Sequence, residues 1–409
     1  MPELTAKVAR HIIETVGSNG TPPQYGFQHF TAGIEPYINV IDKEYLATYI
    51  RDGGSAFKLV VGVYGGGKTH FLYTVRDLAW KHNYVVSYVS LSSGESPFHK
   101  LDKVYAAIVR GLQPPLTPDE LLTPFESGMR AFLLRWHAKQ QEELSKQGFQ
   151  NEDLHYELNS FVDTLAGTDS ISFSNAIKSA VRSLTDARDK NFDQICQWLS
   201  GEGGIAKDLQ PFGISEKIDK STASTMLRSL VQWIGYIGFS GMVILLDEAE
   251  QVPSLSSKQR ELLLSNLREI IDECAHTHFP KVMILYAVPD ENFLEGKTQI
   301  YEALRQRLST VFEDVLNPTG VKIQLEKTIS EPMEFLRSVG KKLAVVYEAA
   351  YGVSLDSEVL HRTVENVARS AYEERYGDIG YRRLFVQRLI GGLHYVRAKG
   401  TAPSVDQLG

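Results

Sequence analysis

The sequence predicts an α/β protein in which a parallel sheet lies between layers of helices. Three apolar runs support this prediction. The first, at 57–61, leads into the glycine-rich stretch 62–69, and a segment without helix breakers follows it. The second, at 242–246, ends in two acids, and the third covers 281–288. Strands that are apolar along their whole length are typical of parallel sheets covered by helices on both faces.

The stretch 62–69 reads GVYGGGKT, the G-x-x-x-x-G-K-T pattern of a phosphate-binding loop, in the expected strand–loop–helix context. Its glycines let backbone N–H groups approach phosphate oxygens, and the following helix adds its unpaired N–H groups and positive dipole end. We expect Lys68 to neutralise the β- and γ-phosphates and Thr69 to offer its hydroxyl to Mg²⁺. The predicted nucleotide-binding residues here are Gly62, Gly65, Gly66, Gly67, Lys68, Thr69 and the adjoining His70.

The second apolar run ends at Asp247 and Glu248, within GMVILLDEAE at 241–250. A buried parallel strand delivers such acids to the carboxyl edge of the sheet, where ligands bind in open α/β folds. We expect Asp247 to hold the Mg²⁺ shell and Glu248 to orient and deprotonate the attacking water. A chain that only bound a nucleotide would have no chemical need for Glu248.

Polar residues beyond the third apolar run are candidates for contacts to the γ-phosphate. Asp290, at the tip of that strand, is the predicted sensor, and Tyr286 is the second candidate; Asp290 alternatively caps the next turn. The helix expected at 301–308 carries Arg305 and Arg307, which we expect to reach a neighbouring subunit's γ-phosphate. A solvated or salt-bridged arginine is the alternative for each.

The remaining segments are mostly helical, and we interpret 113–238 as a helical insertion into a nucleotide-binding domain. Its expected helices cover 124–147, 152–165, 174–199 and 222–237. The expected division of the chain is an N-terminal helical segment (1–54), the first half of the core (55–112), the insertion (113–238), the second half of the core (239–329) and a helical lid (330–409).

The last expected helix carries five basic residues and no acid. These residues are Arg382, Arg383, Arg388, Arg397 and Lys399. Three alternatives stay open for this helix. Arg382 or Arg383 folds back onto the nucleotide phosphates, or the helix presents a basic face to nucleic acid or an acidic partner, or it is simply solvated.

Composition limits the class of protein. The formal net charge of −7 argues against a protein that coats nucleic acid through bulk charge, but leaves room for a local basic face. Cys196 and Cys274 lack metal-ligand spacing, so we expect ordinary thiols in a reducing interior. The start of the chain has no apolar leader and no stretch approaches the length of a membrane span, so we expect a cytoplasmic protein without membrane contact.

The order of these signatures resembles the AAA+ ATPases. More narrowly, 53–72 (GGSAFKLVVGVYGGGKTHFL) and 235–250 (GYIGFSGMVILLDEAE) are similar to the ATP-binding-domain proteins of the BREX bacteriophage-defence systems, which resemble the origin-recognition branch of AAA+. The resemblance implies a three-layer α/β/α core with a five-stranded parallel sheet, a helical insertion and a C-terminal helical lid. It also implies that ATP and Mg²⁺ bind between core and lid.

The resemblance further implies an ATP hydrolase that switches or assembles a DNA-associated anti-phage complex. Lys68 and Glu248 would be catalytic, while Arg305, Arg307 and Arg382 correspond loosely to finger and sensor arginines. The implied partners are further copies of the chain or other defence proteins, such as a helicase, nuclease or methylase, with DNA contacted directly or through them. The alternative is an ATP-gated scaffold that recruits an effector and hydrolyses little ATP.

Overall fold

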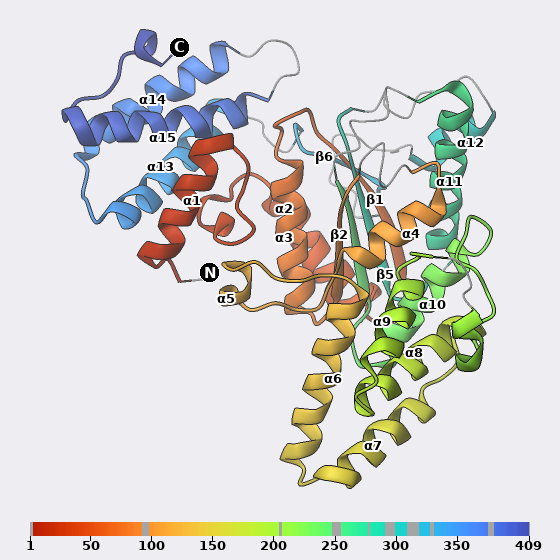
Figure 1. Cartoon of the computed structure of the whole chain (residues 1–409). Helices are drawn as coiled ribbons and strands as arrows, with labels where there is room; N and C mark the ends of the chain where they lie inside the picture. The colour runs from red at the N-terminus through yellow and green to blue at the C-terminus, as the bar shows by residue number, and fades with distance from the viewer. Residues whose placement is uncertain are drawn as a thin grey trace.

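The architecture rests on one central sheet that carries helices on both faces (Figure 1). It is seen in a computed structural model of the whole chain. The structure describes residues 3–91, 98–203, 207–247, 255–276, 279–290, 299–308, 319–327, 331–374 and 380–408.

The sheet has six strands in the order β3-β2-β4-β5-β1-β6. Their bounds are β1 Ser55–Val61, β2 Val85–Ser90, β3 Leu112–Gln113, β4 Met242–Asp247, β5 Val282–Val288 and β6 Lys322–Gln324. All neighbouring pairs are parallel except β2 and β3, which are antiparallel.

The predicted five-stranded sheet was therefore wrong in its total: five strands are parallel, and β3 adds a sixth, antiparallel strand at the edge. In β3, Leu112 and Gln113 pair with Ser87 and Val86 of β2. Pairing stops after these two residues because prolines follow at 114 and 115, and a proline has no N–H to donate to the ladder. A strand this short leaves almost no periodic signal in the sequence.

Side chains of the central strands alternate between two hydrophobic cores, which makes the fold three-layered. In β1, Phe57, Leu59 and Val61 face one core, and Ala56 and Val60 face the other. The first core is completed by α4 (Leu101–Arg110), α8 (Ile171–Thr185), α9 (Asp189–Leu199), α10 (Ala223–Tyr236), α11 (Ser257–Ala275) and part of α12 (Gln299–Leu308). The second is completed by α3 (Lys68–Lys81), a π-helix (Ile41–Tyr49) and the helices of the two chain ends.

Both ends of the chain meet in one helical unit beside the sheet (Figure 1). Helix α1 (Ala6–Asn19) packs against α13 (Pro332–Tyr351) and α15 (Tyr381–Lys399), and α14 (Ser357–Glu373) packs against both of the latter. Short elements complete these regions. They are 3₁₀ turns at Phe27–Phe30, Lys207–Phe212 and Val405–Gln407, and helices α2 (Glu35–Val40) and α5 (Pro118–Leu121).

The helices between β3 and β4 include a long hairpin. Helices α6 (Met129–Lys146) and α7 (Asn151–Thr164) extend away from the sheet in Figure 1. The single helix expected at 174–199 is instead two helices, α8 and α9. The chain breaks between them at Ala187, whose φ of 55° is left-handed and incompatible with a continuing right-handed helix.

Candidate nucleotide-binding site

The predicted phosphate-binding loop and the predicted acidic strand end lie at the same edge of the sheet. The loop follows β1, and Asp247 is the last residue of β4; β5 lies between these two strands and pairs with both. Within the loop, Gly65 and Gly67 have φ values of 73° and 94°, a conformation that favours glycine. Parallel pairing therefore brings together two motifs that are far apart in the sequence.

Thr69 and Asp247 form the predicted magnesium position. The Thr69 hydroxyl donates to Oδ2 of Asp247 at 2.7 Å, and the Asp247 side chain is buried. A hydroxyl and a carboxylate are the hard oxygen ligands that Mg²⁺ prefers, so these two residues fit a Mg²⁺ site.

Tyr88, on β2, also contacts this carboxylate, and the sequence reasoning missed it. Its hydroxyl donates to the same Oδ2 of Asp247 at 2.6 Å. The tyrosine looks like any strand residue in the sequence, and only the pairing of β2 with β4 places it beside Asp247. The hydrogen bond orients the carboxylate that would face the metal.

The Lys68 side chain lies inside the loop. Its Nζ donates to the carbonyl oxygens of Gly62 at 2.9 Å and Val63 at 3.3 Å, and it is only 6% exposed. Glu326, just beyond β6, accepts a hydrogen bond from the Val63 N–H at 3.0 Å. This second contact also escaped prediction, because 263 residues separate its partners.

The start of α15 rests directly on the phosphate-binding loop. The Gly380 N–H donates to the Tyr64 carbonyl at 2.8 Å, and a β-carbon at position 380 would lie 2.3 Å from that oxygen, so the approach requires glycine. Arg382 donates to the carbonyl oxygens of Gly66 and Leu325. The start of α15, the loop and the end of β6 therefore meet at one arginine.

The basic residues of α15 do not share one face. Arg383 donates to the Tyr64 hydroxyl at 2.6 Å, at the same loop that Arg382 contacts. Arg388 pairs with Glu374 at 2.6 Å, and the Arg397 guanidinium lies 4.2 Å from the centre of the Tyr351 ring. The cations of this helix are therefore divided among different neighbours, and its first two arginines lie at the loop.

A cavity adjoins the loop and opens to solvent. It lies between the N-terminal segment, the loop and the lid, and its lining includes Gly20, Phe30, Gly67, Phe335 and Arg382. Its lining is mostly apolar, with a few polar groups near the phosphate-binding loop. A concave, mostly apolar lining with a few polar groups is typical of a small-molecule site.

His70, which follows Thr69, shapes this cavity without adding charge. Its Nε2 is hydrogen-bonded to the Thr31 hydroxyl at 2.7 Å, and the rings of Phe27 and Phe30 contact its edges, each at a centroid distance of 5.3 Å. Burial lowers the pKa of His70 to about 4, so the imidazole is neutral at pH 7. It therefore cannot act as a cation for phosphates at that pH.

The remaining predicted site residues are Asp290, Tyr286, Arg305, Arg307 and Glu248. Asp290 is exposed two residues beyond β5, at the expected edge of the sheet, whereas Tyr286 is buried and stacks on Phe98 at 5.1 Å. Arg305 is exposed and pairs with Glu302 at 3.7 Å. Glu248 and the side chain of Arg307 are outside the described residues.

Both cysteines lie in the first hydrophobic core. Cys196 and Cys274 are buried free thiols, and burial raises the pKa of each to about 12. Across the described ranges, no group of three or more His, Cys, Asp or Glu side chains is placed to hold a metal ion. The helices in those ranges also include none that is long and apolar enough to cross a membrane.

A family model described as BREX system ATP-binding protein BrxC/D matches residues 4–407. No curated protein and no solved structure matches the chain.

Replacing Tyr88 with phenylalanine should weaken the Mg²⁺ dependence of nucleotide binding. The change removes one hydrogen bond to a carboxylate, and a bond of that kind contributes about 1.5–3 kcal/mol. We expect the Mg²⁺ concentration for half-maximal binding of a fluorescent ATP analogue to rise roughly tenfold.

The matched control for this experiment is Tyr84→Phe. That change also removes a single phenol hydrogen bond, to the Leu46 carbonyl at 2.8 Å, but at a distance from the loop. Equal Mg²⁺ dependence in the wild type and both variants would show that Tyr88 does not orient the metal ligand.

His70 should make stability depend on pH below its ordinary pKa of 6.5. Its pKa is lowered in the folded state, so the unfolded chain takes up the proton first and stability falls as pH drops from 6.5 towards 4. His70→Gln keeps a partner for Thr31 but removes this titration. Urea unfolding should show a loss about 2 kcal/mol smaller in the variant between pH 6.5 and about pH 5. Parallel pH profiles for both proteins would refute this role.

Proposed function

The chain belongs to the family of BREX system ATP-binding proteins, and we propose that it is an AAA+ ATPase that binds ATP and Mg²⁺ between core and lid. Hydrolysis switches or assembles a DNA-associated anti-phage complex in the cytoplasm. In this proposal residues 55–112 and 239–329 form the core, 113–238 the insertion and 330–409 the lid, joined by the N-terminal segment 1–54. The observation that supports it most strongly is the Thr69–Asp247 hydrogen bond, beside a loop on which Arg382 rests.

The proposed chemistry is positioning and charge neutralisation. The loop N–H groups and Lys68 would hold the phosphates, and Thr69 and Asp247 would hold a Mg²⁺ ion, whose chemistry is to neutralise charge on phosphate oxygens. Glu248 takes a proton from the attacking water.

Arginines complete the proposed site. Arg382 already lies at the loop, with its guanidinium on the Gly66 carbonyl, and needs only a short movement to reach a phosphate. Arg305 and Arg307 would act on the nucleotide of a neighbouring subunit. The exposure of Arg305 and its weak surface ion pair suit such a role, because little stabilisation is lost when the pair opens. Asp290, exposed beyond the strand between the two motifs, is the proposed sensor.

Replacing Glu248 with glutamine should abolish turnover and leave binding intact. Glutamine has nearly the same shape but cannot accept the proton, and loss of a general base costs about 10²–10⁴-fold in rate. ATP turnover of the purified protein, with and without double-stranded DNA, is the measurement. Lys68→Ala is the control, because it should weaken binding itself.

The outcomes separate two functions. Turnover that vanishes in Glu248→Gln, with ATP still bound, supports an ATPase, and stimulation by DNA would make it DNA-responsive. Wild-type turnover in the variant would refute the base assignment. Binding without any turnover in the wild type would instead identify an ATP-gated scaffold that recruits a helicase, nuclease or methylase.

A further inference from the structure

The end of the α6–α7 hairpin, residues 138–157, is called the arm tip here. All of its residues are described, and none of their side chains is buried. The buried residues of α6 lie between Met129 and His137, and those of α7 are Leu158 and Val162. In Figure 1 the hairpin extends from the body of the molecule into solvent. The arm tip therefore contributes almost nothing to the core of its own chain.

The arm tip is acidic on one side. The α6 charges are paired within the helix, Lys139 with Glu143 and Lys146 with Glu142. On α7, Glu152, Asp153 and Glu157 form no ion pair with described residues. Two of these acids lie in the first helical turn, where they also suit the helix dipole, but Glu157 does not.

The same side of α7 presents a large aromatic ring. Tyr156 is 71% exposed. Helical spacing places it on the same side of α7 as Glu152 and Asp153, one turn before it, and Ser160, one turn after it. Leu144, Phe149 and Leu154 are only partly covered. An exposed tyrosine with acids on the same side of its helix offers a partner an aromatic anchor and a charged rim.

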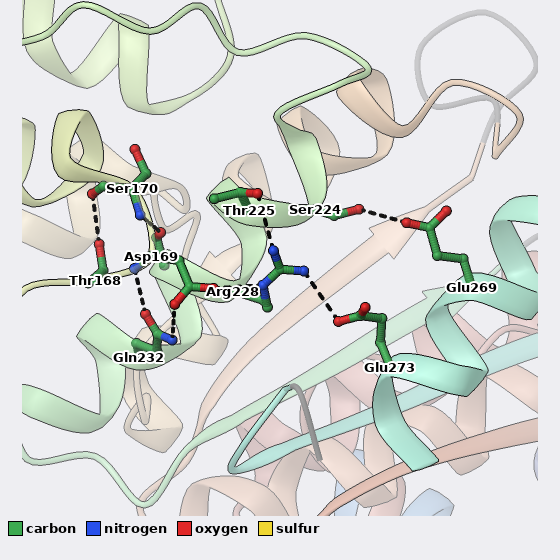
Figure 2. Close-up of polar contacts among 10 residues, drawn as sticks. Thr168, Asp169, Ser170, Ser224, Thr225, Arg228, Gln232, Glu269 and Glu273 are labelled. Atoms are coloured by element: carbon green, nitrogen blue, oxygen red, sulfur yellow. Dashed lines mark hydrogen bonds and ion pairs between the residues drawn. The ribbon is translucent and has the colours of Figure 1, made fainter. Parts of the chain in front are cut away.

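The root of the hairpin is fixed to the core. Figure 2 shows Arg228 of α10 between Asp169, which lies just after α7, and Glu273 of α11. Arg228 donates to Asp169 at 2.7 Å and to Glu273 at 3.3 Å, and Gln232 donates to the other oxygen of Asp169 at 2.7 Å. The hairpin therefore projects from an anchored base, which reduces the ordering cost of binding at its tip.

We propose that the arm tip docks a protein partner whose surface is positively charged and has an apolar pocket for Tyr156. Duplex DNA is the unfavoured occupant, because the free acids would repel its phosphates. This contact is separate from ATP hydrolysis, and it gives the segment between β3 and β4 a role in assembly. The charges would steer the encounter, and the tyrosine would supply most of the affinity.

The test uses the full chain and, as probes, the other proteins of its own BREX system, each purified and titrated separately. Two variants are compared with the wild type. One is Tyr156→Ala, and the other carries Glu152→Gln, Asp153→Asn and Glu157→Gln. The matched control is Tyr236→Ala, a tyrosine at the end of α10 that is 42% exposed. Because none of the substituted side chains is buried, thermal stability and ATP binding should be unchanged in both variants.

We expect Tyr156→Ala to bind one of these proteins at least about tenfold more weakly, with Tyr236→Ala unchanged. The neutralised variant should lose the steep weakening that the wild type shows between about 50 and 300 mM salt. The proposal is overturned if both variants keep wild-type affinity for every probe, or if no probe binds the wild type. It is equally overturned if the variants change only the affinity for duplex DNA, which is titrated in parallel.

Discussion

The contact of Arg382 with the phosphate-binding loop is the interaction on which the rest of the site depends. One guanidinium donates to the Gly66 carbonyl in the loop and to the Leu325 carbonyl beyond β6. The close approach of Gly380 to Tyr64 fixes the start of the helix that carries this arginine. Because α15 also packs on α1, the cavity beside the loop is bounded by both ends of the chain. A nucleotide in that cavity would touch core and lid together.

The sequence was sufficient to predict the motifs that consist of consecutive residues. The loop around Lys68 and the strand ending at Asp247 carry their geometry locally, and parallel pairing through β5 brings their ends together. Tyr88 and Glu326 could not be predicted, because their partners are 159 and 263 residues away in the sequence. The role of His70 also depended on context, since its charge is decided by the rings and the hydroxyl that enclose it.

The basic residues of α15 show the same limit of prediction from sequence. The five cations of this helix left three roles open in the sequence, and the neighbouring elements divide them. Arg383 contacts the loop, Arg388 pairs with α14, and Arg397 lies against α13. The segment between β3 and β4 is the opposite case. Its sequence has no catalytic spacing, yet it folds into an anchored hairpin with an uncovered acidic tip. Charged residues in a sequence therefore indicate a function only when their interaction partners are known.

Hydrogen exchange of the full chain, with and without ATP and Mg²⁺, tests the central claim most directly. If the nucleotide joins core and lid, protection will rise together in the loop at 62–69, in the N-terminal segment at 19–34 and at the start of α15. These three regions line the cavity. Protection confined to the loop, with the lid unchanged at saturating nucleotide, would contradict a site shared by core and lid.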